Sequence, residues 1–253
     1  NELIVPMLSM QGLGDYSRND GYFKGDVTMT NETVKCNYDR GRKFYVDALD
    51  EQETAKVAFS RLAGEFIRTK VVPELDAFRF ASYAGKSGIS KATAADLPDG
   101  AAVLAALRAA ITKMDEDEVP TENRHLFITP TLDGMIADLD TTKSREILTR
   151  FATKTLVPQT RFYTAIDMLD GKTSGEEAGG YKKATGAKNI NFMVFHPSAL
   201  IQFQKHTVPK IKGPEDDLDG DRHMFGYRTV GIADVYANKL AGIYMHNAAE
   251  AGG

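Results

Sequence analysis

Apolar residues recur at helical spacing across residues 51–84, the segment with the strongest helical pattern in the chain. The apolar positions of its first half fall on one helix face: Phe59, Leu62, Ala63, Phe66 and Ile67. Asp50 and Glu53 have the spacing of a capping box, which favours a helix start at this point. Pro73 interrupts the pattern, which then resumes as far as residue 83. We predict one long helix, kinked or restarted near Pro73.

The preceding segment alternates apolar with polar residues in the manner of β-strands. Residues 27–30 and 33–38 are rich in β-branched side chains, Asn31-Glu32 between them is a turn candidate, and residues 43–46 continue the pattern. Residues 1–20 mix apolar residues with Gly, Asp and Asn without a clear period, which favours an extended arm. An isolated hairpin is marginally stable in water. We therefore expect this region to pack on the rest of the chain or on a neighbouring subunit.

Helical and strand patterns are interleaved in the remainder of the chain. Helices are predicted at 99–114 with Asp99 as cap, at 130–139 and at 145–151, and a strand–Pro–helix unit places a further helix at Leu200, Ile201 and Phe203. Strands are predicted at 125–129, 161–168, 191–195, 227–232, 235–236 and 240–245, with surface loops at 170–180 and 213–221. Strand-rich ends around a helix-rich middle define the α+β class.

Composition narrows the functional classes. The chain has 253 residues, of which 42% are hydrophobic and 26% charged, and these ordinary values exclude collagen-like, disordered and coiled-coil proteins. A single cysteine excludes a disulfide framework and favours a reducing compartment. No apolar run approaches the roughly 20 residues of a membrane-spanning helix. A formal net charge of −4 argues against strong counterion-driven binding of nucleic acid.

The motifs that usually signal catalysis, cofactors or metals are incomplete in this chain. Gly85-Lys86-Ser87 and Gly171-Lys172-Thr173 lack the earlier glycine of a phosphate-binding loop, since Phe80 and Ile166 stand at that position. The acidic stretch 215–221 resembles half of a calcium loop, but Gly226 replaces the closing glutamate, which favours a solvated surface loop. We therefore predict no catalytic residues, no cofactor and no metal, and we do not expect an enzyme.

A mixed basic and aromatic segment surrounds Arg40, Arg42 and Lys43. Such a surface suits either single-stranded nucleic acid or another protein. Because Asp39 and Asp47 flank these three cations, we favour a protein–protein contact. The predicted inter-subunit contact residues combine this segment with the hairpin, which has the least core of its own: Tyr22, Phe23, Lys24, Arg40, Arg42, Lys43 and Tyr45.

Four strings of residues stand out along the chain: Tyr38-Asp39-Arg40-Gly41-Arg42-Lys43-Phe44, Thr69-Lys70-Val71-Val72-Pro73-Glu74, Phe195-His196-Pro197-Ser198-Ala199 and Phe225-Gly226-Tyr227-Arg228. They resemble strings found in major capsid proteins of tailed bacteriophages and prophages of the Hong Kong 97 type. The order of elements is similar as well: a β-hairpin, a long amphipathic helix, an Ala-rich helical middle and closing strands. The resemblance covers almost the whole chain.

The resemblance implies a division of the chain into named parts. Residues 1–13 would form an N-terminal arm, 14–50 an extended hairpin called the E-loop, and 51–98 the peripheral domain with its long spine helix. Residues 99–207 would form the axial domain, and 208–253 would return to the peripheral domain as strands and tail. Relatives often lose an N-terminal segment during assembly, which would account for a chain that begins at Asn1.

The resemblance also implies a function. The chain would be a structural subunit that self-assembles into pentamers and hexamers of an icosahedral head shell around double-stranded DNA. Its partners would be other copies of itself, weakly and non-specifically bound DNA, a portal and possible decoration proteins, without a membrane. The shell would assemble in the cytoplasm of a host bacterium and become the virion capsid. The alternatives are an encapsulin-like protein compartment of the same fold and a small cytosolic enzyme with an unrecognised site.

Overall fold

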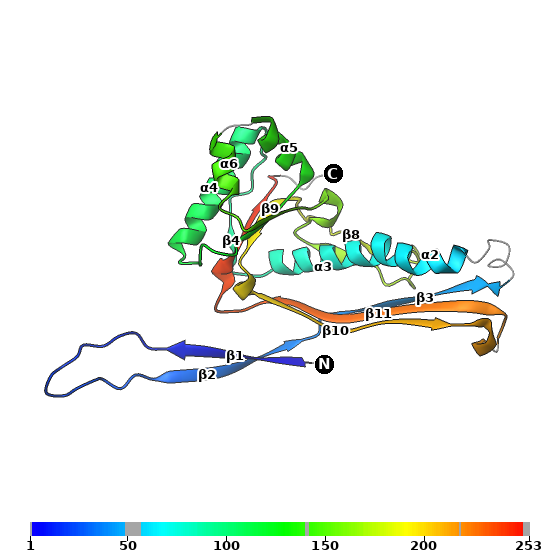
Figure 1. Cartoon of the computed structure of the whole chain (residues 1–253), viewed down its shortest axis with the longest axis horizontal. Coiled ribbons are helices and arrows are strands. Elements are labelled where there is room, and N and C mark those ends of the chain that lie inside the picture. Colours follow the sequence, from blue (N-terminus) through cyan, green and yellow to red (C-terminus); the bar gives the residue numbers. More distant parts are fainter. Residues whose placement is uncertain (1, 49–56, 140–141, 218, 250–253) are drawn as a thin grey trace.

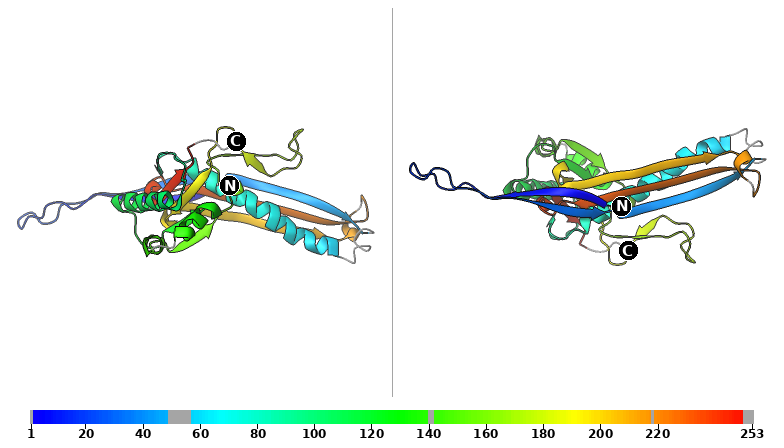
Figure 2. Two further views of the ribbon diagram at one scale, coloured as in Figure 1. Left: turned by 90° about the horizontal axis from the view of Figure 1, so that it is seen from above. Right: turned by 90° about the horizontal axis from the view of Figure 1, so that it is seen from below.

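The computed structural model describes residues 2–48, 57–139, 142–217 and 219–249. Three parts can be followed in Figure 1: a helix-covered sheet, a long helix lying over a second sheet, and a thin hairpin that projects away from both. Two further views show that the hairpin and the long helix extend to opposite sides of the molecule (Figure 2). The protein is thus an elongated plate with two projecting ends.

A five-stranded sheet forms the centre of the plate. Its strand order is β4 (Ser90–Lys91), β12 (Ile243–Asn247), β9 (Ile190–Phe195), β5 (His125–Ile128) and β6 (Thr153–Leu156). The side chains of β9 alternate between two cores: Phe192 and Val194 pack in one, Met193 and Phe195 in the other. Because both faces of β9 pack in apolar cores, its residues 192–195 are all apolar instead of alternating with polar ones.

Three helices cover the first of these cores: α4 (Gly100–Glu116), α5 (Pro130–Leu139) and α6 (Thr142–Leu148). Helix α4 begins as the sequence predicted, because the Asp99 side chain accepts a hydrogen bond from the backbone N–H of Ala102 at 2.8 Å. The predicted strand at 125–129 and the predicted helix at 130–139 are confirmed by β5 and α5.

The long helix consists of α2 (Val57–Phe66), a π-helical turn η1 (Ile67–Val71) and α3 (Val72–Ala84). The irregularity expected near Pro73 is therefore this widened turn, which immediately precedes the proline. The predicted cap at Asp50 and Glu53 lies outside the described residues. At the centre of the helix, Phe66 packs edge-on against Phe44 and Phe225, at ring-centroid distances of 4.8 Å and 6.3 Å.

The sheet beneath this helix has three antiparallel strands in the order β10 (Leu200–Lys212), β11 (Arg222–Val235) and β3 (Tyr38–Asp47). The predicted helix at Leu200, Ile201 and Phe203 is wrong, because these residues begin β10 after a single 3-10 turn, η3 (Pro197–Ala199). Strand β10 gains its hydrogen bonds from β11, a partner that a local pattern does not reveal.

The projecting hairpin pairs β1 (Glu2–Met10) with β2 (Val27–Lys35). The predicted turn at Asn31-Glu32 is wrong, since β2 runs straight through these residues, opposite Pro6 and Val5. The N-terminal segment expected as a separate arm is thus one strand of the hairpin. Strand β3, expected to belong to the hairpin, pairs with β11 instead.

The remaining elements are short and link these parts. The predicted strand at 161–168 is limited to β7 (Ile166–Met168), which follows the 3-10 turn η2 (Gln159–Arg161) and pairs with β8 (Tyr181–Lys183). Two further 3-10 turns, η4 (Pro214–Asp216) and η5 (Leu240–Gly242), precede β11 and β12. The mixture of packed helices and mainly antiparallel sheets confirms the predicted α+β class.

Two glycines in neighbouring helices provide a test of this packing. A Cβ atom at Gly100 would clash with the backbone oxygen of Met135, whereas a Cβ at Gly134 would meet nothing within 4 Å. We expect Gly100→Ala to lower the free energy of unfolding by roughly 1–3 kcal/mol through overpacking. Gly134→Ala, inside α5, should raise it by about 0.5–1 kcal/mol. Urea denaturation measures both, and a neutral or stabilising Gly100→Ala would contradict the close packing of α4 on α5.

Candidate assembly surfaces

The two faces of the β1–β2 hairpin have different environments. On one face, Val5 and Val34 are buried against Ile201 and Ile232 of the three-stranded sheet. These contacts attach the base of the hairpin to the body. Residues directly opposite one another in an antiparallel pair lie on the same face, so the register assigns every second position to the other face.

That other face carries several large apolar side chains although it faces solvent. We call it the outer hairpin face, and its large apolar side chains are between 59% and 71% exposed: Ile4, Leu8, Met10, Val27 and Met29. Leu8 and Met29 form one directly opposed pair, and Met10 and Val27 form the next. Exposed apolar patches of this extent are typical of surfaces that bind another molecule.

The hairpin tip, residues 11–26, carries three of the predicted contact residues. Tyr22 and Phe23 are 91% and 70% exposed, and Lys24 is exposed as well. The centre of the Tyr22 ring lies 5.0 Å from that of Tyr16, so two aromatic rings cluster at the tip. The hairpin that carries this tip projects away from the rest of the molecule (Figure 1). The tip therefore presents aromatic area of the kind that is enriched in protein interfaces.

Asn37 fixes the point where the hairpin leaves the sheet. Its side-chain amide donates to the carbonyl of Ala233 at 2.9 Å, and its side-chain oxygen accepts from the N–H of the same residue at 3.1 Å. The side chain thus replaces a backbone partner of β11 in the gap between β2 and β3. This anchor sets the direction in which the hairpin projects.

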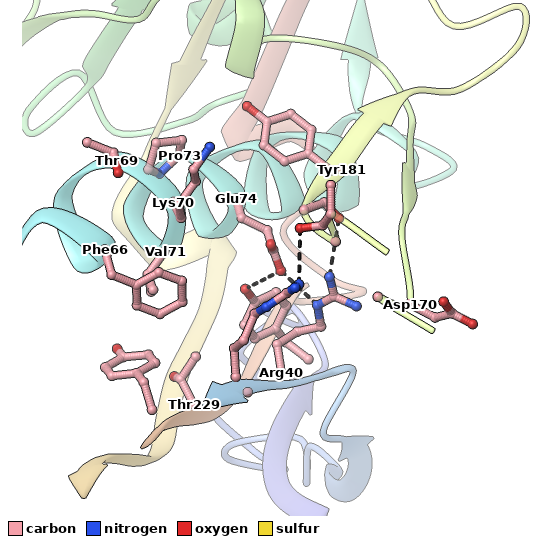
Figure 3. A pocket seen from close by; sticks show the side chains of 18 of the residues that line it. Arg40, Phe66, Thr69, Lys70, Val71, Pro73, Glu74, Asp170, Tyr181 and Thr229 are labelled. Carbon is pink, nitrogen blue, oxygen red and sulfur yellow. Dashed lines mark hydrogen bonds and ion pairs between the residues drawn. The ribbon is translucent and has the colours of Figure 1, made fainter. Parts of the chain in front are cut away.

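Arg40, at the start of β3, joins three elements beneath the long helix. Its guanidinium forms an ion pair with Glu74 of α3 at 2.7 Å and donates to the carbonyl oxygens of Leu169 and Gly180 at 2.7 Å and 3.2 Å (Figure 3). Tyr38 donates to the same carboxylate at 3.1 Å. Burial, followed by the nearby Glu74 carboxylate, raises the pKa of Tyr38 well above its ordinary range, so the phenol keeps its proton.

Of the other predicted contact residues in β3, Arg42 binds a loop of its own chain, whereas Lys43 and Tyr45 lie next to each other near the surface. Arg42 donates to the carbonyl oxygens of Glu177 and Ala178, at 3.0 Å and 3.1 Å, and so holds the loop between β7 and β8. Tyr45 is 42% exposed, and its ring lies 5.2 Å from the Lys43 ammonium. Sequence reasoning missed the contacts that Arg40 and Arg42 make within the chain. Glu74 lies 34 residues from Arg40, and the carbonyl acceptors of both arginines lie at least 129 residues away. Inter-subunit roles for these residues stay a prediction.

A cleft of about 1110 Å³ lies between the long helix, β3 and the β7–β8 segment (Figure 3). Its apolar wall includes Leu62, Phe66 and Tyr227, and its charged lining residues are Asp39, Arg40, Arg42, Arg61, Glu65, Lys70, Glu74, Asp170, Lys172, Lys182 and Lys183. Basic side chains therefore outnumber acidic ones around the cleft. Sequence patterns did not predict it, since its walls come from four separate parts of the chain, β11 included.

Asp170, at the edge of this cleft, is satisfied by its own loop. It accepts hydrogen bonds from the hydroxyl and N–H of Thr173, at 2.6 Å and 2.8 Å, and from the N–H of Lys172 at 2.7 Å. These bonds lower the pKa of Asp170 to about 2. The triplet that superficially suggested a phosphate loop is thus a turn closed by a carboxylate.

Among the described residues, no three His, Cys, Asp or Glu side chains gather as they would around a metal ion. Asp217, in the acidic loop, instead forms an ion pair with Arg222 at 2.7 Å. No helix in the described part of the chain is both long and apolar enough to cross a membrane.

No protein-family model matches the sequence, and no curated protein matches it either. Solved structures, however, match almost the whole chain. A chain of Mycobacterium phage Che8 covers 97% of this chain and 84% of its own length, with a TM-score of 0.62 and 13% identity. The capsid structure of Cyanophage P-SCSP1u covers 98% of this chain and 84% of its own, with a TM-score of 0.68 and 12% identity. A virus-like particle from Pyrococcus furiosus covers 97% of this chain and 86% of its own, with a TM-score of 0.59 and 14% identity.

These similarities establish the fold. The chain has the Hong Kong 97 type of capsid fold that the sequence resemblance implied, over nearly its full length. We refer below to the long helix over the three-stranded sheet, residues 57–84, as the spine helix.

The Arg40–Glu74 pair provides a test of how the spine helix is held. Arg40→Met removes a partly buried cation and leaves the Glu74 carboxylate with the Tyr38 hydroxyl alone. We expect the free energy of unfolding to fall by about 2–4 kcal/mol, since breaking a largely buried pair strands a charge. Thermal or urea denaturation measures the change.

Arg68→Met is the matched control for this prediction. Arg68 pairs with Glu65 on the same helix at 2.8 Å, but both side chains are more than half exposed. Its loss should cost less than about 1 kcal/mol. Equal costs at Arg40 and Arg68 would show that the cluster beneath the spine helix does not stabilise the fold.

Proposed function

We propose that this chain is the structural subunit of an icosahedral shell, assembling with copies of itself into rings of five and six. The capsid-type fold at nearly full length supports this proposal. The main observation in its favour is the outer hairpin face, where five large apolar side chains stay exposed in the isolated chain. A neighbouring subunit would bury them, and at about 25 cal/mol per Å² of apolar area this burial drives association.

Within this proposal the shell is the head of a tailed phage or prophage and encloses double-stranded DNA. Likeness to the capsid of Cyanophage P-SCSP1u supports a virion location. The formal charge of −4 suits a wall that contacts DNA weakly and non-specifically. Assembly in the bacterial cytoplasm, with a portal and decoration proteins as further partners, belongs to the same proposal. The role is structural and non-enzymatic.

The parts of the chain take the following roles in this proposal. Residues 51–98 and 208–253 form the peripheral domain, and residues 99–207 form the axial domain around the five- and six-fold axes. The paired strands β1 and β2 together provide the extended E-loop, so the predicted arm at residues 1–13 acts as part of this hairpin.

A protein compartment is the second candidate, and one observation favours it. The virus-like particle from Pyrococcus furiosus has the same fold and a comparable TM-score. A compartment and a phage head differ in content, since one holds cargo protein and the other holds a genome. Nucleic acid and protein assays on purified particles therefore separate the two.

Lysines on the outer hairpin face test the proposed function directly. We expect the unaltered chain to form megadalton particles and the double variant Leu8→Lys, Met29→Lys to elute as a folded species of tens of kilodaltons. The two lysines oppose each other in the hairpin register, so the interface would have to bury unpaired charge. Size-exclusion chromatography with electron microscopy measures the outcome.

The control places the same charges on the other side of the same strands. Ser9→Lys, Thr28→Lys changes the adjacent opposed pair, whose side chains lie on the opposite face. This variant should retain particle formation. If the unaltered chain stays monomeric, the proposed function is wrong; if both double variants assemble normally, the outer hairpin face is not the interface.

A further inference from the structure

Basic residues around the cleft are left without acidic partners. The acidic lining residues are already engaged: Glu74 pairs with Arg40, Glu65 with Arg68, and Asp39 with Arg228. Asp170 is held by its own loop. Within the part of the chain that the structure describes, four exposed cations of the lining form no ion pair: Arg61, Lys70, Lys172 and Lys182.

The acidic loop, residues 215–221, has an excess of negative charge. It joins β10 to β11 and lies at the tip of the molecule, beyond the start of α2 (Figure 1). Asp217 is paired with Arg222. Four exposed carboxylates of this loop form no ion pair with any described residue: Glu215, Asp216, Asp219 and Asp221. The chain thus has separated basic and acidic surfaces that do not neutralise each other internally.

We propose that the cleft is the docking site for the acidic loop of a second copy of this chain. The inference rests on the proposed function, because a subunit in a closed shell meets other copies through different surfaces of each partner. The contact is heterologous: the cleft of one subunit receives the loop of its neighbour, whose own cleft remains available for a third. Four carboxylates face four cations, which makes the two surfaces complementary in charge.

The shape of the cleft suits an extended protein segment. Its helical wall extends from Arg61 to Glu74, a length of roughly 20 Å at 1.5 Å per residue. An extended segment of about six residues spans that distance. The wall also contains Leu62 and Phe66, which suit the apolar parts of a peptide.

Ion pairs between exposed side chains contribute more to the specificity of an interface than to its affinity. Exposed pairs contribute little individually and weaken as salt screens them. Like charges brought together in an interface, in contrast, cost several kcal/mol. The cleft and loop would therefore select one geometry among the ways in which two subunits meet, while the outer hairpin face supplies apolar area.

Charge reversal on each surface, alone and combined, tests the docking. The cleft variant is Arg61→Glu, Lys172→Glu, and the loop variant is Glu215→Lys, Asp216→Lys. We expect each to lower the yield of particles about 100-fold, since like charges then face each other. The chain that carries all four changes should recover to within about tenfold of the original yield, because the pairs are restored with reversed sign.

The charge-retaining variant Arg61→Lys, Lys172→Arg is the matched control and should assemble normally. Circular dichroism and thermal melting of all variants confirm that the subunits remain folded. Normal assembly by both reversed variants, or no recovery in the combined variant, would overturn the proposed docking.

Disulfide trapping gives a second readout that does not depend on particle yield. Two chains are co-expressed, one with Lys172→Cys and the other with Asp216→Cys, both in a Cys36→Ala background. Oxidation should link the two chains into a dimer on a non-reducing gel. A chain with Arg108→Cys in place of Lys172→Cys is the control and should give at least tenfold less dimer, since Arg108 lies on α4, outside the cleft lining.

The two readouts separate the docking from the proposed function. Linked dimers without particles would support the docking and contradict the shell. Particles without linked dimers would support the shell and overturn the docking. A link from Lys172→Cys to a hairpin tip carrying Tyr22→Cys, in place of the loop, would also overturn it, because the neighbour's hairpin would then occupy the cleft.

Discussion

The packing of the spine helix across the three-stranded sheet is the interaction on which the rest of the structure depends. Phe66 contacts Phe44 of β3 and Phe225 of β11, and so joins residues that are far apart in the sequence. Because β3 is fixed in this sheet, the hairpin that precedes it must leave at Asn37, which is bound to Ala233. The apolar helix stripe therefore also sets the direction of the projecting hairpin.

The elements whose signals are local could be predicted from the sequence. Helix α4 has a cap at Asp99 and its own apolar period, and β5 and α5 follow one another as their pattern indicates. Strand β10 could not be predicted, because its hydrogen bonds come from β11 and its side chains after Ile201 are largely exposed. Strand pairing across long separations leaves little trace in a local pattern.

Strand β1 lacks the alternation of apolar and polar residues that most strands show, and the reason for this is structural. A strand with one buried face alternates apolar with polar residues, but residues 3–8 are apolar at every position. The structure explains this, since Val5 is buried against the body while Ile4 and Leu8 lie on the outer hairpin face. Both faces of β1 are apolar, so no period of two is visible. A strand of this composition outside a closed core indicates that its second face is covered by another molecule.

The candidate contact residues show the limit of reasoning from residue type. Arg40 and Arg42 have the composition of an interface, yet both bind acceptors in their own chain, which only the folded arrangement reveals. The net charge is similarly uninformative by itself. A value of −4 shows that acidic and basic residues nearly balance, but it does not show where on the molecule they lie. Among the described residues, four cations without an ion pair line the cleft, and four carboxylates without an ion pair lie in the loop after β10. Under the proposed self-assembly this separation matters more than the sum, because charges that are not neutralised within one subunit remain available to the next.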